Sequence, residues 1–459
     1  MHYPQGISPA HVRQVFGQTA DLVERTLTVD GQTVTAWFID GLTSGSEIAD
    51  LVIRPAMAAL RGTPAEMVSQ CLSGAVWSAV AKPVKDLQNL CLLLVNGFCV
   101  LIFGEQAVAF EAKTGEKRGI SPPEVENTVK GPKDAFTETV RTNTSLIRRH
   151  LRSPWLRLQE SQVGSKTQTN VALAWLEGVT DPGLVARLGL RLASLNIEGF
   201  LTPASVEEAV TGCRNTAFPL LQYTERTDQF CRGLLNGQVG LLVDGLPLGY
   251  LAPAELAAFL TSPEDRGMDF VSASCVRVLR YGALLVSLLL PGLFAAMAAF
   301  HQEMIPTKLL HAIIQSKEQV PFPTLLEILG LLAAFELLQE AGIHLPKGLG
   351  QTVSIIGGLV VGTAAVEAKL ISPAALIVVS AAGICGFAIP GRELADAVRV
   401  WRFVLTAAAA AAGLFGLTVG LIVLLLHLGS LESFGKSYLR PFDRAKTHGI
   451  LLRRRKPNP

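Results

Sequence analysis

The chain has 459 residues, of which only 17% are charged, and its mean hydropathy is +0.38. Soluble domains carry about 25% charged residues, so this composition favours a membrane protein. A formal net charge of +2 is too small for a protein that neutralises many phosphates, so nucleic-acid binding is set aside. The seven cysteines form no CxxC pair and no Cys/His ligand pattern, which argues against a metal or redox cofactor.

The N-terminal half contains an internal repeat. The segments 34–43 (VTAWFIDGLT) and 171–180 (VALAWLEGVT) are alternating apolar strands that end in an acidic residue and a glycine. Each unit later contains an apolar stretch with Asn96-Gly97 or Asp244-Gly245, which are dipeptides that favour two-residue hairpin turns. We therefore predict two similar α/β subdomains in tandem, each with a hairpin in its second half.

Helical patterns follow both repeated strands, at 46–60 and 181–195, and a third helix is expected at about 133–151 after a Pro- and Gly-rich break. The resulting domain plan comprises a first α/β subdomain (1–120), a basic connector helix (121–160), a second α/β subdomain (161–270), a transmembrane domain (271–431) and a basic cytoplasmic tail (432–459).

The connector helix ends in a cluster of basic residues: Arg141, Arg148, Arg149 and Arg152. These side chains can bind phosphate or acidic lipid headgroups, form a partner surface, or simply be a solvated face. The chain shows no nucleophile elbow, P-loop, dinucleotide fingerprint or zinc-protease motif. The sequence therefore predicts a protein that is not an enzyme.

Two apolar stretches are predicted to cross a membrane. The first, 281–300, has about the 20 residues that a span needs, and Arg277 and Arg280 precede it. Positive charge before the first span places the soluble half in the cytoplasm, as does the lack of a signal-peptide pattern. The second, 403–426, contains six consecutive alanines and a small-residue packing motif.

The region between these two stretches is less regular. It holds shorter apolar runs at 353–365 and 374–389, and a leucine-rich stretch at 324–339 that contains Glu327 and Glu336. These two carboxylates lie about 180° apart on a helix, so one faces lipid unless water or another subunit covers it. The basic tail favours a cytoplasmic C-terminus and therefore four spans over five.

One predicted helix has a face of small and polar residues, which includes Gln351, Ser354, Gly358 and Gly362. Such a face either forms a helix-packing seam or lines a pore in an oligomer, and the two are compatible. Glu327, Glu336 and Glu367 are the charged candidates for an ion path.

Long stretches resemble the GerA-type spore germination proteins, the A subunits of nutrient germinant receptors. The resemblance includes EVENTVKGPKDAFTETVRTNTSLIRRHLRSPWLRL, FPLLQYTERTD, LLVDGLPLGYLAPAEL, HQEMIPTKLL and LQEAGIHLPKGLGQTVSIIGGLVVGTAAVEAKLISP, and covers about residues 34–442. The tail after Phe442 is shorter than in many members, and the long polar leader is lacking.

The resemblance implies a multi-pass protein of the spore inner membrane that acts with a transporter-like B subunit and a lipoprotein C subunit. It also implies a homo-oligomer that forms a ligand-gated ion channel in contact with membrane lipid. Three alternatives stay open: a relative of the stage V sporulation protein AF, a secondary transporter, and a membrane-anchored scaffold. The HQEMIPTKLL and GLGQTVSIIGG stretches favour the receptor subunit over the AF relative.

Overall fold

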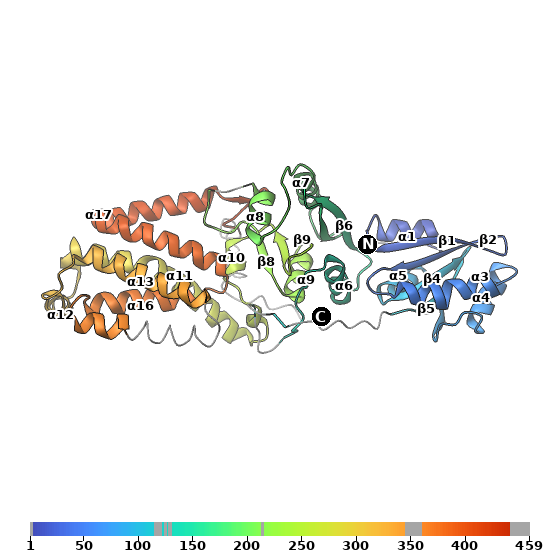
Figure 1. Cartoon of the computed structure of the whole chain (residues 1–459), viewed down its shortest axis with the longest axis horizontal. Coiled ribbons are helices and arrows are strands. Elements are labelled where there is room, and N and C mark those ends of the chain that lie inside the picture. Colours follow the sequence, from blue (N-terminus) through green and yellow to red (C-terminus); the bar gives the residue numbers. More distant parts are fainter. Residues whose placement is uncertain are drawn as a thin grey trace. The chain divides into compact units, whose positions relative to one another are not determined.

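The computed structural model describes residues 3–113, 122–123, 126, 131–212, 215–344 and 360–440. The chain forms two compact units, which are Met1–Arg214 with Leu221–Pro253, and Asn215–Leu220 with Ala254–Pro459. The first unit contains two β-sheets with helices, and the second is built from helices (Figure 1). The predicted fold class, two α/β subdomains followed by a helical part with apolar helices, is confirmed.

The first subdomain is built on a five-stranded antiparallel sheet in the order β1-β2-β4-β5-β3. Its strands are β1 Leu22–Val29, β2 Gln32–Ile39, β3 Ala81–Pro83, β4 Phe98–Phe103 and β5 Gln106–Glu111. The β1–β2 turn is Asp30-Gly31, and both residues have positive φ, as a tight hairpin of this hand requires. The predicted first strand is therefore β2.

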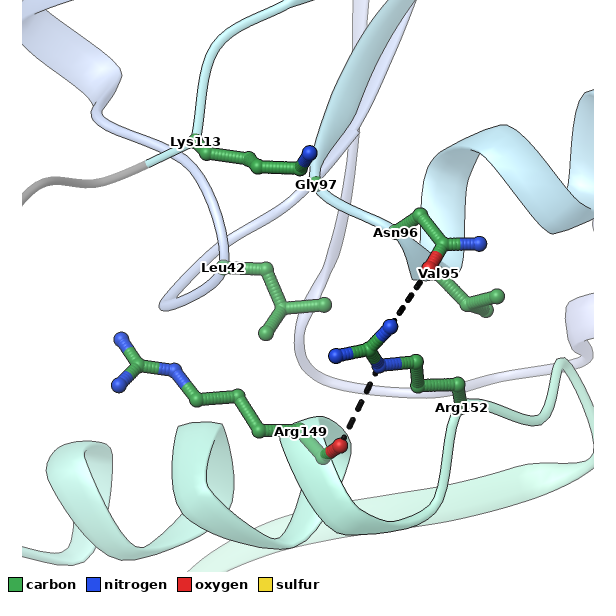
Figure 2. A pocket seen from close by; sticks show the side chains of 7 residues that line it. All are labelled: Leu42, Val95, Asn96, Gly97, Lys113, Arg149 and Arg152. Atoms are coloured by element: carbon green, nitrogen blue, oxygen red, sulfur yellow. Dashed lines mark hydrogen bonds between the residues drawn. The ribbon is translucent and has the colours of Figure 1, made fainter.

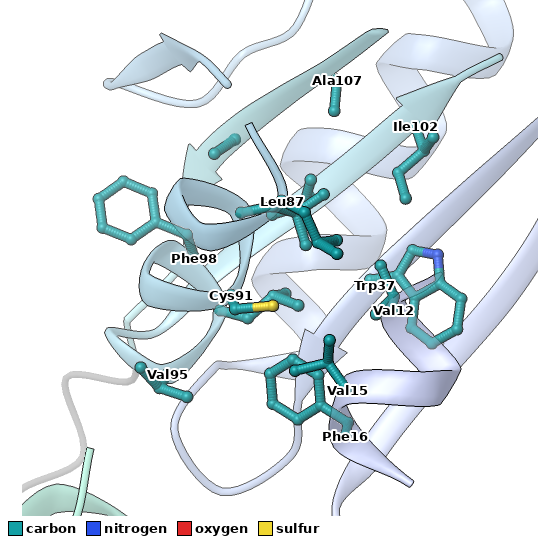
Figure 3. Close-up of a cluster of buried hydrophobic side chains, with 14 of the residues drawn as sticks. Val12, Val15, Phe16, Trp37, Leu87, Cys91, Val95, Phe98, Ile102 and Ala107 are labelled. Carbon is teal, nitrogen blue, oxygen red and sulfur yellow. The ribbon is translucent and has the colours of Figure 1, made fainter. Parts of the chain in front are cut away.

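Helices cover both faces of this sheet. Helices α1 (Pro9–Phe16) and α5 (Leu87–Val95) pack on the face that bears Trp37 and Ile102 (Figure 3). The helical segment from α2 (Gly45–Glu47) through η1 (Ile48–Ile53) to α3 (Arg54–Ala59), followed by α4 (Pro64–Leu72), packs on the opposite face. The alternation of apolar residues along the strands supplies both cores.

The second subdomain repeats this plan. Its sheet has the order β6-β7-β9-β10-β8, which matches the first sheet position by position. The strands are β6 Leu156–Val163, β7 Thr169–Leu176, β8 Gln222–Thr224, β9 Val239–Val243 and β10 Gly249–Ala252. Its helices are α6 Val140–His150, α7 Pro182–Ala193, α8 Pro203–Thr211 and α9 Thr227–Leu235. The next helix, α10 Leu256–Phe259, belongs to the helical unit. The internal repeat is therefore confirmed.

The two predicted hairpins have different outcomes. The Asn96-Gly97 hairpin is wrong, because the apolar residues before it form α5 and Gly97, at φ +82°, ends that helix. Asp86 starts α5 by accepting a hydrogen bond from the Asn89 amide at 2.7 Å. The second hairpin is confirmed as β9–β10, but its connection runs from Asp244 to Leu248 and is longer than two residues.

The helical unit contains two helices that are long and apolar enough to cross a membrane: α11 (Phe270–Ala299) and α17 (Arg392–Ser430). The predicted span at 281–300 therefore lies almost wholly in α11. The shorter helical elements are η2 Pro263–Arg266, η3 Gln302–Met304, α12 Thr307–Lys317, α13 Thr324–His344, η4 Val360–Ala364, α15 Ala365–Glu367 and α16 Pro373–Phe387. The strands β11 (Glu432–Ser433) and β12 (Lys436–Ser437) form a small hairpin after α17.

Helix α17 is not one continuous span. Ala412 (φ −137°, ψ 20°) and Gly413 (φ +61°) leave helical geometry, and the chain doubles back into two adjacent arms (Figure 1). A Cβ atom on Gly416 would collide with the carbonyl oxygen of Ala408, so the arms meet closely beside the turn. The apolar stretch predicted at 403–426 is therefore divided at residues 412–413, and the sequence does not reveal this break because the apolar pattern continues unchanged through the turn.

Candidate functional site

A cationic pocket lies between the two α/β subdomains, and its volume is about 400 Å³. It is lined by Leu42, Val95, Asn96, Gly97, Lys113, Arg149 and Arg152 (Figure 2). The first five residues belong to the first subdomain. The two arginines come from the C-terminal end of α6 and the residues just after it. The pocket therefore depends on how the two subdomains pack together.

Local structure holds the polar groups of this pocket in place. Asn96 follows the last residue of α5, and its side-chain amide donates to the Leu92 carbonyl at 2.6 Å. Its Oδ1 accepts from Nη1 of Arg152 at 3.2 Å, and Nε of Arg152 donates to the Arg149 carbonyl at 3.4 Å (Figure 2). The Lys113 side chain packs tightly against Gly97, because a Cβ atom on Gly97 would lie only 2.9 Å from the Cγ atom of Lys113.

The pocket can attract an anion. Three of its seven lining residues are cationic and none is acidic, although Nζ of Lys113 also pairs with Glu111 at 2.6 Å. Arg149 makes no ion pair with any residue that the structure describes. Guanidinium groups bind carboxylates and phosphates through paired hydrogen bonds. A small carboxylate or phosphate ligand therefore suits this pocket.

A buried ion pair joins the same two subdomains. Arg148 and Asp21 are each 1% exposed, with 2.6 Å between Nε and Oδ2 and 2.9 Å between Nη2 and Oδ1. Thr19 donates to the same carboxylate at 2.7 Å. Burial by itself raises the pKa of Asp21, but the charge of Arg148 and these hydrogen bonds outweigh it, so the pKa lies below its ordinary value.

The predicted basic cluster is thus used largely inside the chain. Arg148 is fully buried, so its assignment to a partner surface is wrong. Arg141 pairs with Asp40 of the first subdomain and with Glu160 at 3.2 Å. Of the four predicted residues, Arg149 and Arg152 line the pocket.

Sequence reasoning did not find the residues that these arginines contact, which include Asp21, Asp40 and Asn96, or Lys113, which lines the same pocket. The Asp21–Arg148 contact joins residues 127 positions apart. No local pattern predicts a contact over that separation.

Two of the three predicted carboxylates, Glu336 and Glu327, have partners on other helices of the helical unit. Glu336 on α13 forms ion pairs with Arg402 and, at 3.3 Å, with Arg399, both on the first arm of α17. Glu327 is 4% exposed and accepts a hydrogen bond from the Ser372 amide at the start of α16. Other helices of the same chain, α16 and α17, therefore supply partners to these two carboxylates, which sequence reasoning expected from water or another subunit.

The remaining predicted residues lie elsewhere. Glu367 is exposed at the end of α15, and Gly362 lies in η4, where a Cβ would have no atom of the described residues within 4 Å. Gln351, Ser354 and Gly358 fall outside the described residues, so their proposed shared face with Gly362 stays a prediction.

Cysteine and metal chemistry receive no support from the part of the chain that the structure describes. No group of three or more His, Cys, Asp or Glu side chains is placed there to hold a metal ion. Burial raises the pKa values of Cys71, Cys91 and Cys99 to about 12, and these thiols therefore stay protonated and unreactive at neutral pH.

Comparisons with known proteins identify the family of this chain. The model of the family described as Bacillus/Clostridium GerA spore germination protein matches residues 10–457. The chain belongs to this GerA family. Spore germination protein KA of Bacillus subtilis (strain 168) is 34% identical over 446 residues, which are 96% of this chain and 82% of that protein.

Two further proteins are similar. Uncharacterized membrane protein YfkQ of Bacillus subtilis (strain 168) is 34% identical over 421 residues, which are 91% of this chain and 82% of that protein. The crystal structure of the N-terminal domain of the A subunit of the Bacillus megaterium spore germinant receptor GerK3 is 24% identical. It covers 53% of this chain and 92% of its own, with a TM-score of 0.42.

Proposed function

We propose that this chain is the A subunit of a nutrient germinant receptor in the spore inner membrane. The observation that carries the proposal is the GerA family match over residues 10–457, which spans both structural units. In this proposal the chain crosses the membrane several times, keeps its α/β unit in the cytoplasm, and acts with a transporter-like B subunit and a lipoprotein C subunit. It has no catalytic role.

The receptor works, in this proposal, as an oligomeric ion channel gated by nutrients. Two apolar helices are compatible with membrane association. The ion pairs of Glu336 neutralise its charge within one chain, so this residue supports the helix bundle. The ion path is assigned instead to the stretch of Gln351, Ser354, Gly358 and Gly362, and it is supported by Gly362, where no atom of the residues that the structure describes lies within 4 Å of the position of a Cβ.

A spore experiment tests the receptor assignment. Spores that lack their own germinant receptors are given this chain with its B and C partners, and are exposed to a nutrient mixture. Germination that requires this chain supports the proposal. Germination that proceeds equally without it contradicts the proposal, and an AF-like accessory role becomes the better assignment.

The cationic pocket adds a ligand site to this proposal. Lys113, Arg149 and Arg152 surround a space of about 400 Å³, which is large enough for a small carboxylate or phosphate. Titration of the full-length protein with acetate and inorganic phosphate, followed by calorimetry, measures this binding. The pocket assignment requires saturable heat that disappears when both arginines are replaced by glutamine, and equal heat in the variant excludes the pocket.

A further inference from the structure

The two α/β subdomains carry the same local surface, which we name the turn-and-helix-end surface. In the first subdomain it consists of the turn Gly41-Leu42 and the helix end Val95-Asn96-Gly97. In the second it consists of the turn Gly178-Val179 and the helix end Leu235-Asn236-Gly237. Each turn follows the second strand of its sheet, and each helix end precedes the central strand.

The geometry of the two surfaces agrees closely. Gly97 and Gly237 have φ angles of +82° and +87°, so both helices end in the same left-handed residue. A Cβ atom on Gly97 would lie 3.2 Å from the carbonyl oxygen of Leu42, and one on Gly237 would lie 3.1 Å from that of Val179. The repeat therefore preserves this surface in atomic detail, beyond the strand order alone.

The two turn-and-helix-end surfaces of the chain differ in how far they are covered. In the first subdomain Leu42 is 7% exposed and Val95 is 2% exposed. In the second, the corresponding Val179 and Leu235 are 47% and 54% exposed. An apolar pair that is buried in the first subdomain is thus exposed to solvent in the second.

The first surface is covered by α6 and the residues that follow it. Arg152 donates to Asn96, and the Cβ of Ser145 lies 3.0 Å from where a Cβ on Gly41 would be. The counterpart of α6 in the first subdomain is α1, because the sheets match and five residues separate each helix from its first strand. Gln18, which is exposed, is therefore the counterpart of Arg152.

We propose that the turn-and-helix-end surface of the second subdomain binds the first subdomain of a second copy of this chain. The second copy places its α1 where α6 lies within one chain, with Gln18 beside Asn236. This contact is head to tail, so it leaves a free surface at each end and produces a ring when it closes. The inference rests on the proposed function for the oligomeric assembly, and it specifies the contact.

Cross-linking of the full-length protein in detergent tests the contact. Gln18→Cys and Asn236→Cys are combined in a chain whose Cys213, Cys275 and Cys385 are serine, and a short bismaleimide is added. We expect covalent dimers and higher multiples on a denaturing gel. Adding Val179→Glu and Leu235→Glu, two exposed positions, is expected to lower the yield at least tenfold.

Two matched pairs control this experiment. Asn96→Cys with Arg152→Cys has the same geometry within one chain and must cross-link internally, which gives monomers that carry one bismaleimide and no multiples. Gln18→Cys with Leu201→Cys must give no multiples, because Leu201 lies outside the proposed contact. The side chain of Leu201 is 77% exposed. If no cross-links form, native mass spectrometry of the same sample distinguishes two possible reasons. Oligomers without cross-links overturn the proposed surface alone, and a monomer overturns both this surface and the oligomeric channel.

Discussion

The two structural units bury charge in different ways. In the α/β unit, Arg148 is matched by a single carboxylate, and its remaining donors reach the carbonyls of Ser153 and Leu156 at 2.9 and 3.0 Å. In the helical unit, one carboxylate, Glu336, faces two arginines. The first arrangement is balanced and complete, and it fixes one subdomain against the other.

The helical arrangement is less complete. Arg402 is 2% exposed, and its Nε has no hydrogen-bond partner among the described residues. A buried donor without a partner costs about 1–3 kcal/mol. The two units therefore differ in how completely the hydrogen-bonding groups of their buried arginines are satisfied.

The largest effect is expected from Asp21→Ala. The substitution leaves the buried Arg148 charge without its partner, and breaking a buried pair in this way costs about 3–5 kcal/mol. Urea unfolding of the full-length protein, followed by tryptophan fluorescence, measures the change. Asp40→Ala removes the half-exposed partner of Arg141 and is the control, with an expected cost of about 1 kcal/mol or less. Equal effects of the two substitutions would contradict the expectation that the buried ion pair stabilises the fold more than the half-exposed one.

Glu336→Gln is expected to have an intermediate effect. It leaves the buried Arg402 without its counter-ion, whereas Arg399 keeps its ion pair with Asp396 at 2.9 Å. Glu336 is 22% exposed, so water relieves part of the cost. We expect a loss of about 1–3 kcal/mol, seen as a lower melting temperature in detergent. Glu367→Gln is the control, because Glu367 is exposed and should leave the melting temperature unchanged. An unchanged melting temperature for Glu336→Gln would show that the cluster does not hold the helices together.

The α/β unit should also respond to acid through Asp21. The pKa of Asp21 is lowered in the folded state, so the ion pair contributes its full stabilisation at pH values above the ordinary aspartate pKa of about 4. That stabilisation is lost as the pH falls through the lower, folded-state pKa. Unfolding midpoints between about pH 6 and pH 2 should therefore fall steeply for the wild type and less steeply for Asp21→Asn. Parallel curves would assign the acid sensitivity to other carboxylates.

The smallest effect on stability is expected from Arg149→Gln. Arg149 makes no ion pair with the described residues, so the unfolding midpoint should stay within about 0.5 kcal/mol of the wild type. Phosphate affinity should fall about tenfold, because one charge-assisted contact is lost. Calorimetry measures the binding. A large loss of stability with unchanged phosphate affinity would make Arg149 a structural residue.

The sequence predicts the repeat well because period-2 strands and acid-Gly turns are local signals. It does not distinguish α5 from a strand, since a short apolar run fits both and the deciding feature is the cap at Asp86. It also does not reveal the turn at Gly413, because alanine and glycine are common in continuous apolar helices. Contacts such as Asp21–Arg148 depend on tertiary packing and leave no local pattern.

The most direct test of the receptor account is ion flux from liposomes that hold this chain with its B and C partners. The account predicts flux that requires a nutrient and is abolished by Gly362→Leu. Gly330→Leu leaves the flux intact and is the control, because a Cβ on Gly330 likewise has no atom of the described residues within 4 Å. Liposomes that stay tight under every nutrient condition, while oligomers remain intact, would contradict the channel and favour a membrane-anchored scaffold.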